Sequence, residues 1–250
     1  MAENAGPSAM SAFERREALK EVYAATQGCT RCPQLVAGRT TVVFGAGNAD
    51  ADLAFVGEAP GATEDEQGLP FVGRAGKLLD TLLAEIGMAR NEAFVMNVLK
   101  CRPPGNRDPQ PIEIENCREY LYSQVELIQP RVLCTLGNFS TKLLRGDPSG
   151  ITRVHGQPEV ITLGRRSVRL YPLYHPAAAL RTPAMLDALR ADFARIPDLL
   201  ALPAPEQPPA ADADEALELP ELHELAAEAA AGAAEEPAMA AAPADQLGLF

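Results

Sequence analysis

Four short apolar runs divide this chain, and they restrict its fold more than any other feature. They cover residues 53–56, 94–100, 131–137 and 168–174. The stretches between them show helical periodicity, so strands alternate with helices and no tight hairpin is expected between strands. This alternation predicts an α/β fold, in which a parallel sheet is covered by helices on both faces.

The expected helices lie between and around these strands. The pattern predicts helices over residues 13–25, 74–87 and 111–128, a helix that begins at Asn138, and a last helix that ends near Arg195. The helix over 74–87 carries leucines on its buried side and stops at Gly87, a residue type that often ends helices. Residues 41–44 form a further short β-prone run, and residues 45–52 a turn.

Charge is distributed unevenly along the 250 residues, whose formal net charge is −12. All 22 lysines and arginines lie between Arg15 and Arg195, whereas 11 of the 34 acidic residues follow residue 200. The body of the chain is therefore nearly neutral, and an acidic segment is attached to it. The acidity of the whole chain does not exclude a nucleic-acid partner for the body.

Changes in composition divide the chain into four parts. We expect a disordered N-terminus at residues 1–12, a globular domain at 13–200, a disordered linker rich in alanine and proline at 201–244, and a short apolar end at 245–250. No apolar run is long enough to span a bilayer, and the sequence has no signal-peptide core. We therefore expect a soluble, cytoplasmic protein without a membrane partner.

Five cysteines give the chain its clearest chemical signal. Cys29 and Cys32 form a C-x2-C pair, Cys101 follows after 68 residues, and Cys117 after 15 more. Four thiolates can complete a tetrahedral zinc site or hold an iron–sulfur cluster, and the spacing alone does not choose between them. Cys134 lies inside an apolar run and is expected to be a buried small side chain. An odd count without a secretion signal argues against disulfides.

A loop bounded by glycines follows the first apolar run. Residues 57–73 include the acidic series Glu64, Asp65 and Glu66 and contain no lysine or arginine. Open α/β sheets bind ligands where a strand ends, but an acidic loop is a poor phosphate site. The loop suits a neutral ligand or a bound water, and the alternative is an ordinary acidic surface loop.

Several motifs follow one another along the chain: Gly57-Glu-Ala-Pro-Gly61, Pro70-Phe-Val-Gly73, Asn97-Val-Leu-Lys-Cys-Arg-Pro-Pro-Gly-Asn-Arg107 and His175-Pro-Ala. Together with Cys117 they resemble the family 4 uracil-DNA glycosylases, the iron–sulfur type. The resemblance covers about residues 16–196. It implies a three-layer α/β/α domain with a central four-stranded parallel sheet. It also implies a [4Fe–4S] cluster on Cys29, Cys32, Cys101 and Cys117.

The resemblance also implies which residues bind uracil. Phe71 would stack on a base that is flipped out of the DNA. Asn97 would read this base, because an amide can accept from uracil N3–H and donate to O4, whereas cytosine presents the opposite pattern. His175 would donate to O2 as negative charge develops on the leaving base. Gly57, Glu58 and Ala59 would line the pocket.

Each of these side chains also has an ordinary structural interpretation. Phe71 could be a core aromatic, Asn97 could cap a turn, and His175 could belong to a structural strand end. All three lie at or beside the carboxyl ends of expected strands, where such sheets bind ligands, and this favours the functional interpretation.

The attacking water is the one part of the reaction to which the motifs assign no residue. Better-known glycosylases of the superfamily have an aspartate in the first motif, and this chain has Ala59 in its place. Our hypothesis is that Glu64, together with Asn106, orients the water. Glu58 is the alternative.

Contacts with DNA are expected from a leucine and several arginines. By resemblance, Leu180 would fill the space that the flipped base leaves in the stack. Arg107 and Arg181, with Arg102 and Arg153, are candidates for phosphate contacts, and the alternative is that they are solvated surface arginines. The sequence therefore predicts a monofunctional DNA glycosylase that removes uracil in base excision repair. The alternative is a non-catalytic, metal-stabilised protein that binds uracil-containing or single-stranded DNA, and the alanine at position 59 is its main support.

The C-terminal residues 246–250, Gln-Leu-Gly-Leu-Phe, resemble the pentapeptide with which bacterial proteins bind the DNA sliding clamp. Their position after an acidic, linker-like segment strengthens this interpretation. The resemblance implies a bacterial, nucleoid-associated protein that meets the clamp through its C-terminus. We expect the protein itself to be a monomer.

Overall fold

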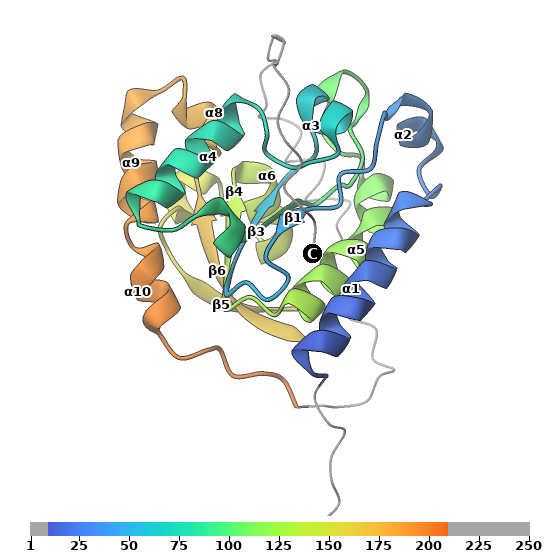
Figure 1. Ribbon diagram of the computed structural model, residues 1–250. Coiled ribbons are helices and arrows are strands. Elements are labelled where there is room, and N and C mark those ends of the chain that lie inside the picture. Colours follow the sequence, from blue (N-terminus) through green and yellow to red (C-terminus); the bar gives the residue numbers. More distant parts are fainter. Residues whose placement is uncertain (1–9, 210–250) are drawn as a thin grey trace, which may run out of the picture.

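The computed structural model describes residues 10–209 of the chain. The predicted clamp-binding end and most of the predicted linker lie outside these residues. Within them, one sheet lies between two layers of helices, as Figure 1 shows. The expected α/β/α arrangement is confirmed.

Six strands form the sheet in the order β1-β3-β2-β4-β6-β5. The four central strands, β3, β2, β4 and β6, pair in parallel. This confirms the predicted four-stranded parallel sheet, whose strands are covered on both sides and are therefore almost wholly apolar. The strand bounds are Ala46–Gly47 for β1, Leu53–Gly57 for β2, Phe94–Asn97 for β3, Val132–Leu136 for β4, Glu159–Leu163 for β5 and Arg166–Leu173 for β6.

Each edge of the sheet carries an antiparallel strand that the sequence analysis did not predict. β5 and β6 form a hairpin across Gly164 and Arg165, so the expectation of no tight hairpin was wrong. Gly164 has a φ of 60°, the left-handed conformation that such turns require. At the other edge, pairing falls on β1 instead of on residues 41–44, because the Val43 N–H donates to the Lys100 carbonyl oxygen in the loop after β3.

The helices cover the two faces of the sheet separately (Figure 1). Along β2, Ala54 and Val56 belong to a core shared with α1, α5 and α6, whereas Leu53 and Phe55 belong to a second core beneath α4, α9 and α10. Successive residues of a strand point to opposite faces, so one apolar strand serves both cores. The helix bounds are Ala12–Gln27 (α1), Pro33–Gly38 (α2), Ala62–Gln67 (α3), Arg74–Glu85 (α4), Arg90–Glu92 (η1), Pro104–Asn106 (η2), Pro111–Ile128 (α5), Asn138–Arg145 (α6), Ile151–Val154 (α7), Pro176–Ala179 (α8), Pro183–Phe193 (α9) and Ile196–Ala201 (α10).

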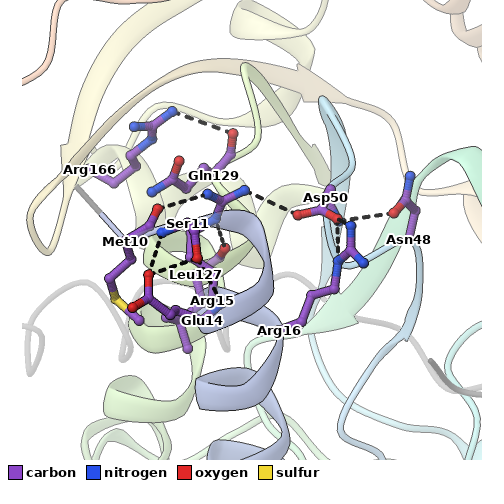
Figure 2. A network of polar contacts seen from close by, with 10 residues as sticks. All are labelled: Met10, Ser11, Glu14, Arg15, Arg16, Asn48, Asp50, Leu127, Gln129 and Arg166. Atoms are coloured by element: carbon purple, nitrogen blue, oxygen red, sulfur yellow. Dashed lines mark hydrogen bonds and ion pairs between the residues drawn. The ribbon is translucent and has the colours of Figure 1, made fainter. Parts of the chain in front are cut away.

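Polar contacts fix the start of α1 to the edge of the sheet where the parallel strands begin (Figure 2). Arg15 Nε donates to the Leu127 carbonyl oxygen at 3.0 Å, close to the end of α5. Arg15 and Arg16 both pair with the Asp50 carboxylate, in the turn before β2, at 3.1 and 2.5 Å. Ser11 caps the helix reciprocally with Glu14.

The chain that follows α10 runs along the same edge. Arg131 donates to the Leu202 carbonyl oxygen, and Arg169 Nη2 donates to that of Pro203 at 3.1 Å. The Gln207 side chain pairs with the backbone of Ser167 through two hydrogen bonds of 3.0 and 3.1 Å. Contacts with the body thus extend beyond residue 200. In the part of the chain that is described, no helix has both the length and the apolar character needed to cross a bilayer.

Candidate active site

The carboxyl ends of the parallel strands meet at one edge of the sheet. Gly57, the last residue of β2, lies opposite Asn97, the last residue of β3. Beside them, Gly137 follows β4 and donates its N–H to the Leu173 carbonyl oxygen at 2.9 Å, and His175 lies just beyond β6. This edge is where open α/β sheets bind their ligands.

Phe71, Asn97 and His175 gather around the backbone of Gly57. A Cβ atom on Gly57 would lie 2.4 Å from Asn97 Oδ1 and 2.6 Å from Phe71 Cζ. The rings of Phe71 and His175 are 5.8 Å apart between centroids and tilted by 30°. The structure therefore brings together the residues that were predicted to bind the base, in a space that only glycine at position 57 leaves open.

Asn97 contributes a polar atom that lacks a partner. The residue is buried, with 2 % of its surface exposed, and its Oδ1 has no hydrogen-bond partner among the described residues. Its backbone carbonyl oxygen, by contrast, accepts from Lys100 Nζ at 2.7 Å. A buried acceptor without a partner costs about 1–3 kcal/mol. The position of Oδ1 is therefore suited to a ligand with an N–H donor.

His175 precedes α8 and is oriented by its own backbone. Its Nδ1 accepts a hydrogen bond from the Ala177 N–H at 3.0 Å. An accepting Nδ1 carries no proton, so the neutral ring carries its proton on Nε2 and donates from there. Gly137 permits the approach of this histidine, since a Cβ atom at that position would lie 3.0 Å from His175 Cβ.

Phe71 is held in an uncommon backbone conformation by Glu64. Its φ is 54°, in the left-handed region that a bulky residue rarely adopts. Glu64 Oε1 accepts from the N–H groups of Val72 and Gly73, each at 3.1 Å. Space for the turn comes from Gly76, where a Cβ atom would lie 1.7 Å from the Phe71 carbonyl oxygen. The structure thus gives Glu64 a role as an anchor of this loop, which the sequence motifs did not indicate.

Glu58 and Ala59, which follow Gly57 in the first motif, lie in different surroundings. Ala59 packs against the core that contains α1 and α5. Burial raises the pKa of the Glu58 carboxyl to about 7, and the negative charge of Asp108 adds to this effect. Glu58 is therefore partly protonated near neutral pH, which is consistent with either donating or accepting a proton.

Four cysteines line a single pocket beside this site. Cys29, Cys32, Cys101 and Cys117 come from the turn between α1 and α2, from the loop after β3 and from α5. All four are free thiols, and Cys101 and Cys117 are buried. Cys134 lies apart from them in the middle of β4, completely buried, as predicted for a small core side chain.

Hydrogen bonds to sulfur make this pocket suited to thiolates. Arg39 Nη1 donates to Cys101 Sγ at 3.0 Å, the Lys100 N–H donates to Cys117 Sγ at 3.3 Å, and Asn116 Nδ2 donates to Cys32 Sγ at 3.5 Å. Sequence reasoning missed Arg39 and Asn116, because they reach the cysteines across 62 and 84 chain positions.

Whereas hydrogen bonds to sulfur favour the thiolate form, burial of these cysteines favours the protonated thiol. It raises the pKa of the Cys117 thiol to about 12 and also raises the pKa values of Cys32 and Cys101. In residues 10–209 no three His, Cys, Asp or Glu side chains gather closely enough to hold one metal ion. The cysteine pocket therefore does not form a compact single-ion site.

Comparison with known proteins agrees with this geometry. The family model of the uracil DNA glycosylase superfamily matches residues 44–196. This range includes Gly57, Phe71, Asn97 and His175 and two of the four cysteines of the cysteine pocket. This chain belongs to that superfamily. The type-4 uracil-DNA glycosylase of Archaeoglobus fulgidus is 41 % identical to it over 187 residues, which are 73 % of this chain and 94 % of that protein.

Other relatives of the superfamily are equally similar. The type-4 uracil-DNA glycosylase of Sulfurisphaera tokodaii is 42 % identical over 192 residues, which are 75 % of this chain and 87 % of that protein. That of Thermotoga maritima is 44 % identical over 170 residues, or 68 % and 86 % of the two chains. The family that the motifs indicated is thus confirmed.

The residues predicted to contact uracil-containing DNA differ in their surroundings. Leu180, at the end of α8, has 39 % of its surface exposed, and Arg181 beside it is exposed as well. Arg107 instead pairs through both Nη atoms with Glu113, at 2.9 and 2.6 Å. Its guanidinium group is therefore engaged within the protein.

Asn106 lies on the surface in the loop after β3, with a φ of 55°. Its Oδ1 accepts from Arg102 Nε at 2.7 Å. Among the described residues, no hydrogen bond joins Asn106 to Glu64, its predicted partner in orienting the water. If Asn106 and Glu64 act together, a water molecule must bridge them, because no direct hydrogen bond joins their two side chains.

The raised pKa of Glu58 predicts a pH-dependent effect on stability. Folding favours the protonated carboxyl, so the wild type loses stability as the pH rises from the ordinary value of 4.5 to about 7. Glu58→Gln removes this loss and should raise the free energy of unfolding by about 3–4 kcal/mol at pH 8.5, because the pKa is raised from 4.5 to about 7 and each unit corresponds to roughly 1.4 kcal/mol, with little change at pH 4.5. Urea denaturation at the two pH values measures the difference.

Glu66→Gln, at an exposed position of α3, is the matched control for this substitution. An equal gain for Glu58→Gln at pH 4.5 and pH 8.5 would contradict the assignment, since it would show that the carboxyl has no raised pKa in the folded protein.

Proposed function

We propose that this protein is a monofunctional DNA glycosylase that hydrolyses the N-glycosidic bond of uracil in DNA, as the first step of base excision repair. The observation that carries the proposal is the unpaired, buried Oδ1 of Asn97 beside the ring of Phe71. Uracil N3–H would satisfy this acceptor. Cytosine has a lone pair at N3 and would leave it unpaired, which disfavours cytosine strongly.

Phe71 and His175 complete the proposed uracil site. Phe71 would stack on a flipped base, and its strained backbone, fixed by Glu64, would keep the ring in place. His175, with its proton on Nε2, would donate to uracil O2 and stabilise the charge that develops as the glycosidic bond breaks. Gly57, Glu58 and Ala59, at and after the end of β2, would form the adjoining wall of the pocket.

The reaction needs no Schiff base. Lys100 is the lysine of the sequence motifs that lies nearest to the proposed uracil site. Its Nζ is buried and donates to the Asn97 carbonyl oxygen and to Gln124 Oε1. It therefore has no access to the deoxyribose carbon. This supports hydrolysis by water and argues against a lyase step.

We propose that Cys29, Cys32, Cys101 and Cys117 hold a [4Fe–4S] cluster. The support for this is that the four cysteines line one pocket, as the resemblance to the iron–sulfur glycosylases implies. The hydrogen bonds from Arg39, Asn116 and the Lys100 backbone are of the kind that stabilises cluster sulfurs. When bound, the cluster would cross-link the α1–α2 turn, the loop after β3 and α5.

Glu64 remains our candidate for orienting the attacking water, with Asn106 as its proposed partner. Glu64 Oε1 is engaged with the Phe71 loop, while Oε2 lies on the side of Gly61, where a Cβ atom would approach it to 2.8 Å. One carboxylate could thus position both the ring and the water. Leu180, Arg181 and Arg107 remain the proposed contacts with DNA.

The first test of the function counts turnovers. Protein purified without oxygen is incubated with an oligonucleotide that contains one uracil, and alkali-labile sites are counted for each protein molecule. We expect many sites for each molecule. Asn97→Ala should lower kcat/KM on the order of 100-fold or more, while Asn91→Ala, an exposed asparagine in η1, should not. Retention of the uracil-DNA without any cleavage would favour the non-catalytic binding protein.

Glu64→Gln tests the role of the carboxylate in the chemistry. Glutamine keeps an oxygen that can accept from Val72 and Gly73, so the Phe71 loop should persist while the charge that orients water is lost. We expect kcat to fall about 10–100-fold with KM little changed. Full activity of this variant would refute the hypothesis, and Glu58→Gln would then be examined for the same role.

The C-terminus is proposed to bind the DNA sliding clamp of a bacterial, nucleoid-associated repair system, with the protein itself a monomer. The support for this is the sequence Gln246-Leu-Gly-Leu-Phe250, which follows an acidic segment rich in alanine and proline. Deletion of residues 246–250 should abolish binding to the clamp in a pull-down or calorimetric assay and leave excision on short oligonucleotides unchanged. Unchanged affinity for the clamp would refute this role.

A further inference from the structure

Lys100 is a buried cation that lies between the two sites. It has 1 % of its surface exposed and is among the largest fully buried side chains. Its Nζ donates to the Asn97 carbonyl oxygen at 2.7 Å and to Gln124 Oε1 at 2.5 Å. Both acceptors are neutral, and no carboxylate of residues 10–209 pairs with it. A buried ammonium group is unfavourable unless negative charge lies nearby.

The cysteine pocket supplies that negative charge. Lys100 lines the pocket with the four cysteines, its backbone N–H donates to Cys117 Sγ at 3.3 Å, and Cys101 is the next residue in the chain. Four thiolates carry more negative charge than the [4Fe–4S] core, iron and sulfide ions taken together, neutralises, so a loaded pocket keeps a net negative charge. The ammonium group of Lys100 therefore compensates the pocket electrostatically when the pocket is loaded.

The same ammonium group determines how the loop after β3 leaves the sheet. Its bond to the Asn97 carbonyl oxygen closes a short turn between the residue that reads the base and the first cysteine of the loop. Gln124, its second acceptor, belongs to α5, the helix that carries Cys117, and donates through Nε2 to the Phe44 carbonyl oxygen at 2.9 Å. The backbone of Asn97 is thus linked to the cysteine-bearing helix through one side chain.

We propose that Lys100 is a positioning residue that couples the cysteine pocket to base recognition. Its ammonium group balances the charge of the loaded pocket and at the same time fixes the backbone of Asn97, so that Oδ1 faces the base. This inference rests on the proposed function. It gives the cluster a part in uracil recognition without any redox step, because the charge of the cluster keeps Lys100, and through it Asn97, in place.

Lys100→Met tests the coupling, because methionine has a similar length and no charge. Two quantities are measured on protein as purified with its iron: the rate at which a chelator bleaches the visible absorbance of the cluster, and kcat/KM for uracil excision. We expect iron to be lost several-fold faster and kcat/KM to fall about 10–100-fold, the range typical of residues that support metal ligands. Lys142→Met on α6 is the matched control and should change neither.

A second variant keeps the test decisive if Lys100→Met cannot be loaded with iron. Gln124→Leu leaves the ammonium group in place and removes one of its two acceptors, so both measured quantities should shift in the same direction by a smaller factor. The inference would be overturned if Lys100→Met keeps both its iron-loss rate and its kcat/KM within twofold of the wild type. If Lys100→Met does not load with iron, the same result for Gln124→Leu would overturn it. A wild-type protein that releases no uracil would instead refute the proposed function.

Discussion

The parallel register of β2 and β3 is the constraint on which the site depends. It sets Gly57 directly opposite Asn97 at the ends of their strands. Because Gly57 has no side chain, the Asn97 amide and the Phe71 ring can share the space above it. A slip of one residue would turn the Asn97 side chain to the other face of the sheet. The two apolar cores that hold the register therefore also hold Asn97, the proposed base-reading residue, beside Gly57.

The short segment that follows β3 joins the proposed base site to the cysteine pocket. Asn97 ends the strand, Lys100 turns back to it, and Cys101 enters the cysteine pocket. Such closeness means that neither site is mechanically independent of the other. Loss of order in the pocket would reach Asn97 through covalent geometry and one hydrogen bond. The proposed cluster would thus stabilise Asn97, the residue proposed to select the substrate.

Much of this arrangement could be predicted from sequence, because strong local patterns mark it. The four buried strands appear as apolar runs, and Cys134 could be separated from the other cysteines by its place within one run. The hairpin of β5 and β6 was missed because β5 is a half-exposed edge strand without a buried apolar run, whereas β6 was predicted. The anchoring of Phe71 by Glu64 and the pairing of Arg107 with Glu113 were missed because the sequence gives no sign of the partner that an acidic side chain will have in the fold. Such contacts depend on the folded backbone.

Both ends of the described chain leave the molecule at the edge where the parallel strands begin, opposite the base pocket (Figure 1). The Arg15 and Arg16 contacts with Asp50 hold one end there, and Arg131 and Arg169 hold the other. A domain fused directly to residue 10 or to residue 209 would therefore lie on the side of the sheet away from the proposed base pocket. Attachment at either of these two positions thus leaves the carboxyl ends of the parallel strands open.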